Sequence, residues 1–390
     1  LILYFFKKQC YSIFELKDTE YLHSDFLCKK WRSNIMANWK KIALFGSTAL
    51  LLAACGNGDT TDDAGTDTDT GDATEEPAET DSETSDFSIA MVTDTGGVDD
   101  RSFNQSSWEG MQAWADAINY YQSEAEDQYI QNLNSATQDG YDVIYGIGFL
   151  LLDPINEVAQ QNPDNWYGLV DEISGEPNVV SLTFRDHENS FLAGMAAALT
   201  TETDQIGFIG GIEGQVIDRF QTGFEAGVAY VNPDIEVDVQ YAASFGDAGI
   251  GQQIASAMYQ SGVDVIFHAA GAVGNGVFQE ARNRMNADSD TQLWVIGVDR
   301  DQSDEGEWDE GNLTLGSTIK NVGAAVGQSA TDAMNGNFAG GETIAYGLAE
   351  DGIDFVYHED MPQEIIDQIE EARQGIIDGE IEVPEFTYSQ

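Results

Sequence analysis

The chain has 390 residues, with 69 acidic and 16 basic side chains and a formal net charge of −53. A surface that binds nucleic acid needs clustered Lys and Arg to contact the phosphates, so this charge balance excludes nucleic acid as a partner.

The segment 36–54 has the layout of a lipoprotein signal peptide. It combines a basic start, an apolar run over 42–52 and small residues directly before Cys55. The apolar run is shorter than the ~20 residues that a membrane-spanning helix requires. We therefore expect cleavage before Cys55 and lipidation of that cysteine, which would anchor the protein to the outer face of the cell membrane. Residues 1–35 precede a complete signal, so we expect them to be upstream sequence that the native protein lacks.

Residues 55–86 are predicted to be the lipidated cysteine followed by an acidic, disordered tether. The segment 56–86 holds twelve acidic residues and no basic or aromatic residue, so it cannot bury a core. Cys55 would be the only cysteine of the mature chain, which excludes a disulfide within it. The mature chain would carry a net charge near −57, and self-repulsion on this scale indicates a saline environment in which salt screens the charge.

From residue 87 onward, strand-like and helix-like segments alternate. Continuous apolar runs typical of buried parallel strands alternate with amphipathic segments, which predicts a doubly wound α/β fold. The expected strands are 88–93, 141–147, 166–170, 179–184, 205–209, 237–243, 263–269, 292–298 and 313–319, with a weaker candidate at 118–122. The expected helices are 104–116, 153–161, 188–200, 215–230, 248–261, 274–286 and 322–335.

Residues that could bind a small molecule follow these strands. In parallel sheets the ligand lies beyond the carboxyl ends of the strands, where carboxylates, amides and aromatic rings suit a polar molecule that contains a ring. Lys320 stands out because it is the only lysine after Lys41 and it ends a predicted strand. The candidates are Asp94, Asp100, Phe103, Asn104, Asp153, Gly271, Phe278, Asp299 and Lys320.

Several of these residues also have simpler structural interpretations. Phe103 and Phe278 could be core residues, Asp94 and Asp299 could cap helices, and Lys320 could belong to a salt bridge. The sequence holds no G-x-S-x-G elbow, no metal-binding histidine spacing and no phosphate-binding loop motif. We therefore expect no enzyme activity, no catalytic residue, no metal and no cofactor.

The motif Asp94-x-Gly-Gly-x-x-Asp100-x-Ser102-Phe103-Asn104-Gln105 resembles the opening motif of the basic membrane lipoprotein family, the purine nucleoside receptors of ABC importers. Further similar segments follow in the same order at 148–149, 271–278, 298–302 and 317–322. The resemblance implies the type I periplasmic binding protein fold, with two Rossmann-like lobes of parallel sheets joined by a three-segment hinge. Lobe one would comprise 87–184 plus 316–340, and lobe two would comprise 185–315 plus 341–390.

The same resemblance implies roles for individual residues. Phe103 and Phe278 would clamp a purine, and Asp100 would contact the edge of the base. Asp299 and Lys320 would contact the ribose, and Asp153 would lie elsewhere in the cleft. The implied partners are a purine nucleoside and the permease and ATPase of an ABC importer, with the receptor itself a monomer. A receptor for a sugar or a signalling molecule on the same fold, a lipid-anchored hydrolase and a surface adhesin remain alternatives.

Overall fold

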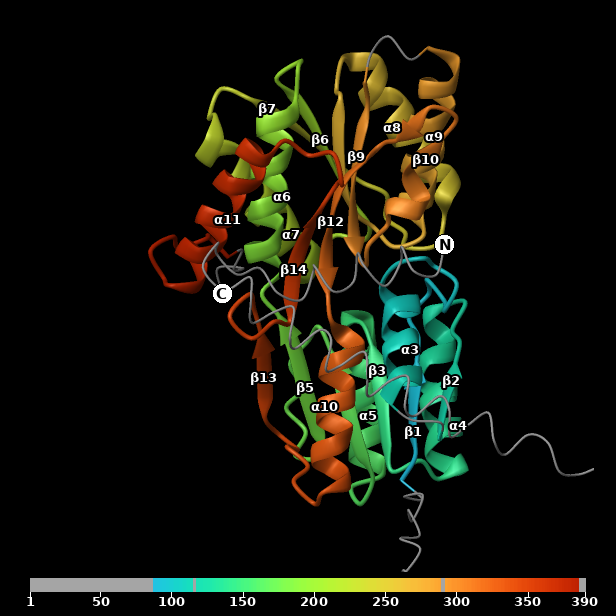
Figure 1. Ribbon diagram of the computed structural model, residues 1–390. Helices are drawn as coiled ribbons and strands as arrows, with labels where there is room; N and C mark the ends of the chain where they lie inside the picture. The colour runs from blue at the N-terminus through green and yellow to red at the C-terminus, as the bar shows by residue number, and fades with distance from the viewer. Residues whose placement is uncertain (1–86, 115–116, 289–291, 386–390) are drawn as a thin grey trace, which may run out of the picture. The chain divides into compact units, whose positions relative to one another are not determined.

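The computed structural model describes residues 87–385, apart from 115–116 and 289–291. The expected signal peptide, Cys55 and the acidic tether lie outside the described residues. Within this range the chain forms two lobes, each built on a six-stranded sheet (Figure 1). The α/β class and the parallel sheets expected from the sequence are confirmed.

The sheet of lobe one has the strand order β13-β5-β4-β3-β1-β2, and all of its strands are parallel. Its strands are β1 (Ile89–Val92), β2 (Ile118–Tyr121), β3 (Val143–Ile147), β4 (Trp166–Val170), β5 (Val179–Phe184) and β13 (Thr343–Tyr346). Ile89 and Met91 face one hydrophobic cluster while Ala90 and Val92 face another, so both faces of the sheet are buried.

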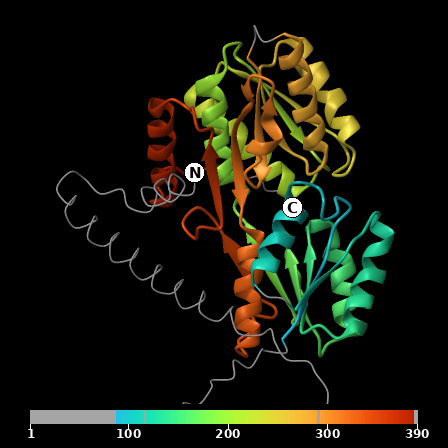
Figure 2. The ribbon, with the colours of Figure 1, turned by 45° about the vertical axis from the view of Figure 1, so that its right-hand side comes forward.

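Helices cover both faces of this sheet (Figures 1 and 2). Helices α3 (Phe103–Trp114) and α10 (Val322–Met334) pack together on one face, and α4 (Tyr129–Asp139) and α5 (Leu152–Gln161) pack on the other. A Cβ added to Gly110 of α3 would lie 2.5 Å from the Cα of Gly323 in α10, so only glycine allows this close crossing. The crossing fixes the position of α3, whose first residues reach the cleft.

The sheet of lobe two has the order β14-β12-β9-β8-β6-β7 and is parallel except for the edge strand β14. Its strands are β6 (Gln205–Gly210), β7 (Glu236–Tyr241), β8 (Val265–Ala269), β9 (Trp294–Asp299), β12 (Thr314–Lys320) and β14 (Ile353–Tyr357). The helices are α6 (Asp186–Thr200), α7 (Gln215–Val231), α8 (Ala248–Ser261), α9 (Val273–Ala287) and α11 (Gln363–Ile377), with a short hairpin of β10 (Glu307–Trp308) and β11 (Gly311–Asn312).

Three short 3₁₀ helices are also present in the described residues of the two lobes: η1 (Glu126–Gln128), η2 (Phe149–Leu151) and η3 (Ser303–Gly306).

The two lobes repeat one arrangement of strands. The series β2-β1-β3-β4-β5 in lobe one matches β7-β6-β8-β9-β12 in lobe two. In such sheets the ligand site lies where the strand order reverses, here beyond β1 and β3 in one lobe and beyond β6 and β8 in the other.

The chain passes between the sheets three times, and two of these crossings differ from the expected positions. The first follows β5, as expected from a boundary at 184/185. The second was expected at 315/316, but β12 pairs with β9 and β14 as far as Lys320, so the chain crosses after that residue. The third was expected at 340/341, but β13 still pairs with β5, so the chain crosses between Tyr346 and Ile353.

Candidate functional site

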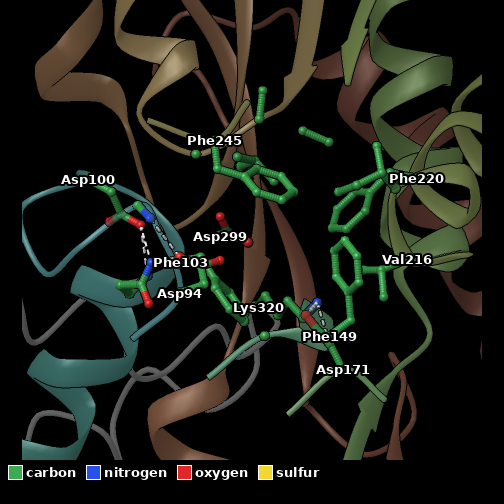
Figure 3. Close-up of a pocket in the computed structure, with 18 residues that line it drawn as sticks. Asp94, Asp100, Phe103, Phe149, Asp171, Val216, Phe220, Phe245, Asp299 and Lys320 are labelled. Atoms are coloured by element: carbon green, nitrogen blue, oxygen red, sulfur yellow. Dashed lines mark hydrogen bonds and ion pairs between the residues drawn. The ribbon is translucent and has the colours of Figure 1, made fainter. Parts of the chain in front are cut away.

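A cavity lies between the two lobes, beyond the carboxyl ends of their strands (Figure 3). The lining side chains come from both lobes and meet across the cavity. They are Asp94, Gly96, Asp100, Phe103, Asn104, Gly148, Phe149 and Asp171 from lobe one, and Val216, Ile217, Phe220, Phe245, Ala269, Ala270, Gly271, Val298, Asp299 and Lys320 from lobe two.

The first turn of α3 brings a carboxylate and an amide to the cavity. The Asp100 carboxylate accepts hydrogen bonds from the backbone N–H groups of Ser102, Asn104 and Gln105 at 2.9–3.1 Å, so it satisfies the free N–H groups at the start of the helix. The Asn104 amide donates to Asp94 at 2.7 Å and to Asp100 at 3.0 Å. Asn104 Oδ1 is buried and has no partner among the described residues, so it can accept a hydrogen bond from a ligand.

Lys320 forms the centre of a buried ionic cluster. Its Nζ lies 2.7 Å from the Asp171 carboxylate of lobe one and 3.1 Å from the Asp186 carboxylate at the start of α6 in lobe two. The same atom lies 5.4 Å from the ring centre of Phe103 and 5.5 Å from that of Phe220. Lys320 therefore links the lobes as well as facing the cavity.

Four phenylalanines contribute to the apolar part of the cavity wall. Phe103 and Phe149 belong to lobe one, while Phe220 and Phe245 belong to lobe two. The rings of Phe149 and Phe245 meet edge to face, with centroids 6.1 Å apart. Aromatic walls contributed by both lobes suit a flat ligand that is enclosed when the lobes meet.

Burial raises the pKa of several carboxyl groups around the cavity. The pKa of Asp94 rises to about 6 and that of Asp299 to about 7, although hydrogen bonds to both groups and the charge of Lys320 near Asp299 act in the opposite direction. Burial likewise raises the pKa of Asp186 to about 6. Burial tends to lower the pKa of Lys320, but the charges of Asp171, Asp186 and Asp299 outweigh it and hold that pKa above its usual value. Near neutral pH the cavity thus holds carboxyl groups that are poised to donate or accept hydrogen bonds.

The cavity contains seven of the nine candidate binding residues. They are Asp94, Asp100, Phe103, Asn104, Gly271, Asp299 and Lys320. Within the described residues no group of three or more His, Cys, Asp and Glu side chains is placed to hold a metal ion.

Phe278 lies in the hydrophobic core of lobe two, not in the cavity. It is fully buried, and its ring meets His268 edge to face at 5.7 Å. It lies more than one turn into α9, where the nearby Val277 and Ala281 are also buried in this core. The predicted clamp between Phe103 and Phe278 is therefore wrong.

Asp153 is also absent from the cavity wall. The 3₁₀ turn η2 follows β3 directly, so Phe149 lies at the strand end and lines the cavity. Asp153 is displaced into the first turn of α5, where it is exposed. Its predicted place in the cleft is not supported by this geometry.

Several lining residues were not predicted from the sequence, most clearly Asp171, Phe220 and Phe245. Asp171 directly follows β4, so the strand-end rule that singled out Asp299 could have found it. Phe245 lies in the loop between β7 and α8, and Phe220 lies within α7. No local pattern distinguishes these two rings from core phenylalanines.

Two lobes with repeated doubly wound sheets and a cavity between them, lined by both, define a solute-binding protein of the type I periplasmic class. The chain belongs to the family described as PnrA-like ABC transporter substrate-binding proteins, whose family model matches residues 87–387. Membership implies a transporter permease as partner and a bound solute as cargo. In the part of the chain that the structure describes, no helix is long and apolar enough to span a membrane.

Similar proteins support this assignment. The chain is 52% identical to a CD4+ T-cell-stimulating antigen of Listeria monocytogenes, covering 77% of this chain and 88% of the relative. It is 45% identical to the ABC transporter nucleoside-binding protein BmpA of Lactococcus lactis, covering 77% and 89% respectively. Among solved structures, a solute-binding protein of an ABC transporter system from Aeropyrum pernix matches with a TM-score of 0.68 and 26% identity, covering 77% of this chain and 94% of that one.

Proposed function

We propose that this protein captures a nucleoside, most favourably a purine nucleoside, and delivers it to the permease of an ABC importer without chemical change. The observation that carries the proposal is the composition of the cavity, where aromatic walls adjoin two separate sets of polar groups. The nucleoside-binding relative from Lactococcus lactis, which shares 45% of aligned residues, supports the same ligand class.

The two polar sets suit the two parts of a nucleoside. Asp94 and the free Asn104 Oδ1 lie beside Phe103 and can bond the edge of a stacked base. Asp299, Lys320 and Gly271 lie on the lobe-two side, where a carboxylate can accept hydrogen bonds from paired ribose hydroxyls. Phe245 replaces Phe278 as the lobe-two ring that can stack on the base, because it lines the cavity opposite the lobe-one residues.

A thermal-shift screen with nucleosides, free bases and simple sugars tests the ligand class. Purine nucleosides should raise the melting temperature, and chromatography should recover them unchanged. A shift caused by sugars alone would favour the sugar-receptor alternative, and ligand turnover would favour a hydrolase.

We also propose that the protein acts outside the cytoplasm as a lipid-anchored monomer. The signal-peptide pattern before Cys55 supports a lipid anchor at that cysteine. Wild-type protein expressed in a bacterial host should partition into detergent. Cys55→Ala should give protein that is soluble or uncleaved, and a cleaved Cys55→Ala protein that stays on the membrane would contradict the anchor.

The acid excess supports a saline habitat. After residue 86 the chain holds 53 acidic and eight basic residues, so like charges repel in the folded state. Molar NaCl should raise the melting temperature relative to dilute buffer because it screens this repulsion. A melting temperature that falls or stays constant with added salt would contradict the proposal.

A further inference from the structure

Three consecutive residues of lobe one are each held by lobe two at one side of the cavity. The carbonyl oxygen of Asp100 accepts a hydrogen bond from the Asn275 amide at 3.2 Å. The carbonyl oxygen of Arg101 accepts one from the Gln302 amide at 2.9 Å, and the Ser102 hydroxyl donates to Asp299. The segment 100–102 is therefore a point of attachment between the lobes.

An ion pair strengthens this attachment. Arg101 Nη1 lies 2.6 Å from Glu305 Oε2 in η3 of lobe two. The Glu305 side chain is only 12% exposed, and Arg282 of α9 donates to the Glu305 carbonyl oxygen, which helps to hold η3 in place. Gln302 is buried and also bonds the backbone N–H of Val298 at 2.8 Å, so both anchor points in lobe two are fixed by their own lobe.

The backbone at Arg101 has a conformation that is unfavourable by itself. Its φ is +59°, in the left-handed region that residues other than glycine rarely adopt. Such a conformation persists only where surrounding contacts impose it, and here those contacts come from the other lobe. Because α3 begins directly after this segment, the position of Arg101 is tied to that of Phe103 and Asn104 in the cavity wall.

The distribution of basic residues also indicates attachment between the lobes. Only eight basic residues follow residue 86, and both lobes are strongly acidic. Arg101 of lobe one pairs with Glu305 of lobe two, and Arg300 of lobe two lies 3.9 Å from Glu109 of lobe one. A chain with so few cations thus places two of them where they offset repulsion between its lobes.

We propose that Arg101 and Glu305, with Gln302 and Asn275, form a clasp that holds the lobes closed and sets the rate of ligand release. None of these four residues lines the cavity, so the clasp is a positioning device and not a ligand contact. The inference rests on the proposed function in that a bound solute must leave by separation of the lobes.

Stopped-flow measurement of nucleoside dissociation tests the clasp with Arg101→Gln, Glu305→Gln and the double variant. The matched control is Glu280→Gln, which breaks the Arg284–Glu280 pair of 2.8 Å within lobe two. Each clasp variant should release ligand about two- to fivefold faster, the usual range for an exposed ion pair. The double variant should be no faster than the single variants because both remove the same interaction. Association rates and denaturation midpoints should stay close to wild type.

A second readout separates this proposal from the proposed function. Spin labels at Gln131→Cys on α4 and Gln260→Cys on α8, in a chain whose Cys10, Cys28 and Cys55 are changed to Ser, report the distance between the lobes without ligand. Glu305→Gln should shift this distance distribution, and Glu280→Gln should leave it as in wild type. If no nucleoside binds, the proposed function fails and the distances alone decide on the clasp. The clasp is overturned if Glu305→Gln changes neither dissociation nor distance, or if Glu280→Gln changes them equally.

Discussion

Phe103, Phe245 and Phe278 differ in surroundings although all three belong to segments that follow strands. Phe103 and Phe245 line the cavity, whereas Phe278 is fully buried in the core of lobe two. The sequence could identify the segments after the strands that carry Phe103 and Phe278, but it could not show which way each ring points. A helix makes one full turn in every 3.6 residues, so the direction of the Phe278 ring depends on where α9 begins and how it packs.

Alanine substitutions should separate these roles. Phe103→Ala and Phe245→Ala should each weaken binding of a purine nucleoside by about 1–3 kcal/mol, because one stacking face is lost. Phe278→Ala should instead lower the free energy of unfolding by about 3–5 kcal/mol through the cavity it leaves. Calorimetric titration and urea denaturation measure the two effects. Normal binding by Phe103→Ala, or a loss of binding without a loss of stability in Phe278→Ala, would contradict the site as described.

Lys320 was expected to contact a sugar, and in the structure it forms buried ion pairs. It pairs with both Asp171 and Asp186, and its side chain is only 2% exposed. Removing one partner of a buried ion pair leaves an uncompensated charge, so Lys320→Met should cost about 3–5 kcal/mol of stability. Adding Asp186→Asn to that variant should restore part of the lost stability, because it removes one of the carboxylates left without a partner. Asp186 does not line the cavity, so this second change leaves the cavity wall intact. A Lys320→Met protein as stable as wild type in urea would show that the cluster contributes nothing to folding.

Among the secondary-structure elements, the sequence predicted those strands and helices whose formation depends on local pattern. The continuous apolar runs of β3, β5 and β8 matched strands buried on both faces, and the helix expected at 274–286 matched α9 closely. The strands β13 and β14 were missed because they are short edge strands with few buried residues: none of the four in β13 is buried, and two of the five in β14 are. The crossing after β12 was misplaced because its position depends on pairing with β9 and β14, and no pattern within residues 314–320 records those partners.

For the binding site, too, only the positions that follow from local sequence pattern could be predicted. The strand-end rule located Asp94, Asp299 and Lys320, since their positions follow from strand direction alone. Phe220 and Phe245 are brought to the cavity by the packing of α7 and of the loop before α8. Those positions arise from tertiary contacts that the sequence pattern does not show.

At the scale of the whole molecule, the buried carboxyl groups predict an unusual response of stability to pH. The pKa values of Asp94 and Asp186 lie near 6 and that of Asp299 near 7 in the fold, above the ordinary value of 3.8. A raised carboxyl pKa means that the folded state binds more protons than the unfolded state, so stability is lost as pH rises through the folded pKa. Among these carboxyl groups, Asp299 contributes most to the change of stability near neutral pH. Burial, Asp100 and Asp171 raise its pKa, whereas Lys320 and Ser102 lower it.

Two histidines limit this effect at lower pH. Burial lowers the pKa of His187 and of His268 to about 4, so their contribution is lost as pH falls from about 6.5 toward 4. The free energy of unfolding should therefore rise as pH falls from 8 to 6.5 and go on rising toward about pH 5, because three carboxyl groups gain protons on folding while only two histidines lose them. Asp299→Asn should flatten the rise, whereas Asp304→Asn, at an exposed position, should not. Urea denaturation across this range checks the prediction, and stability that falls from pH 8 to 6.5 would contradict it.

The central claim is that the cavity between the lobes holds one nucleoside. Calorimetric titration of a purine nucleoside into the purified protein tests this most directly, with the free base and ribose as comparison ligands. We expect saturable binding of one nucleoside per chain, with weaker binding of the base and of ribose, because each fills only part of the cavity. Binding of ribose as tight as that of the nucleoside, or no binding by any purine nucleoside, would contradict it.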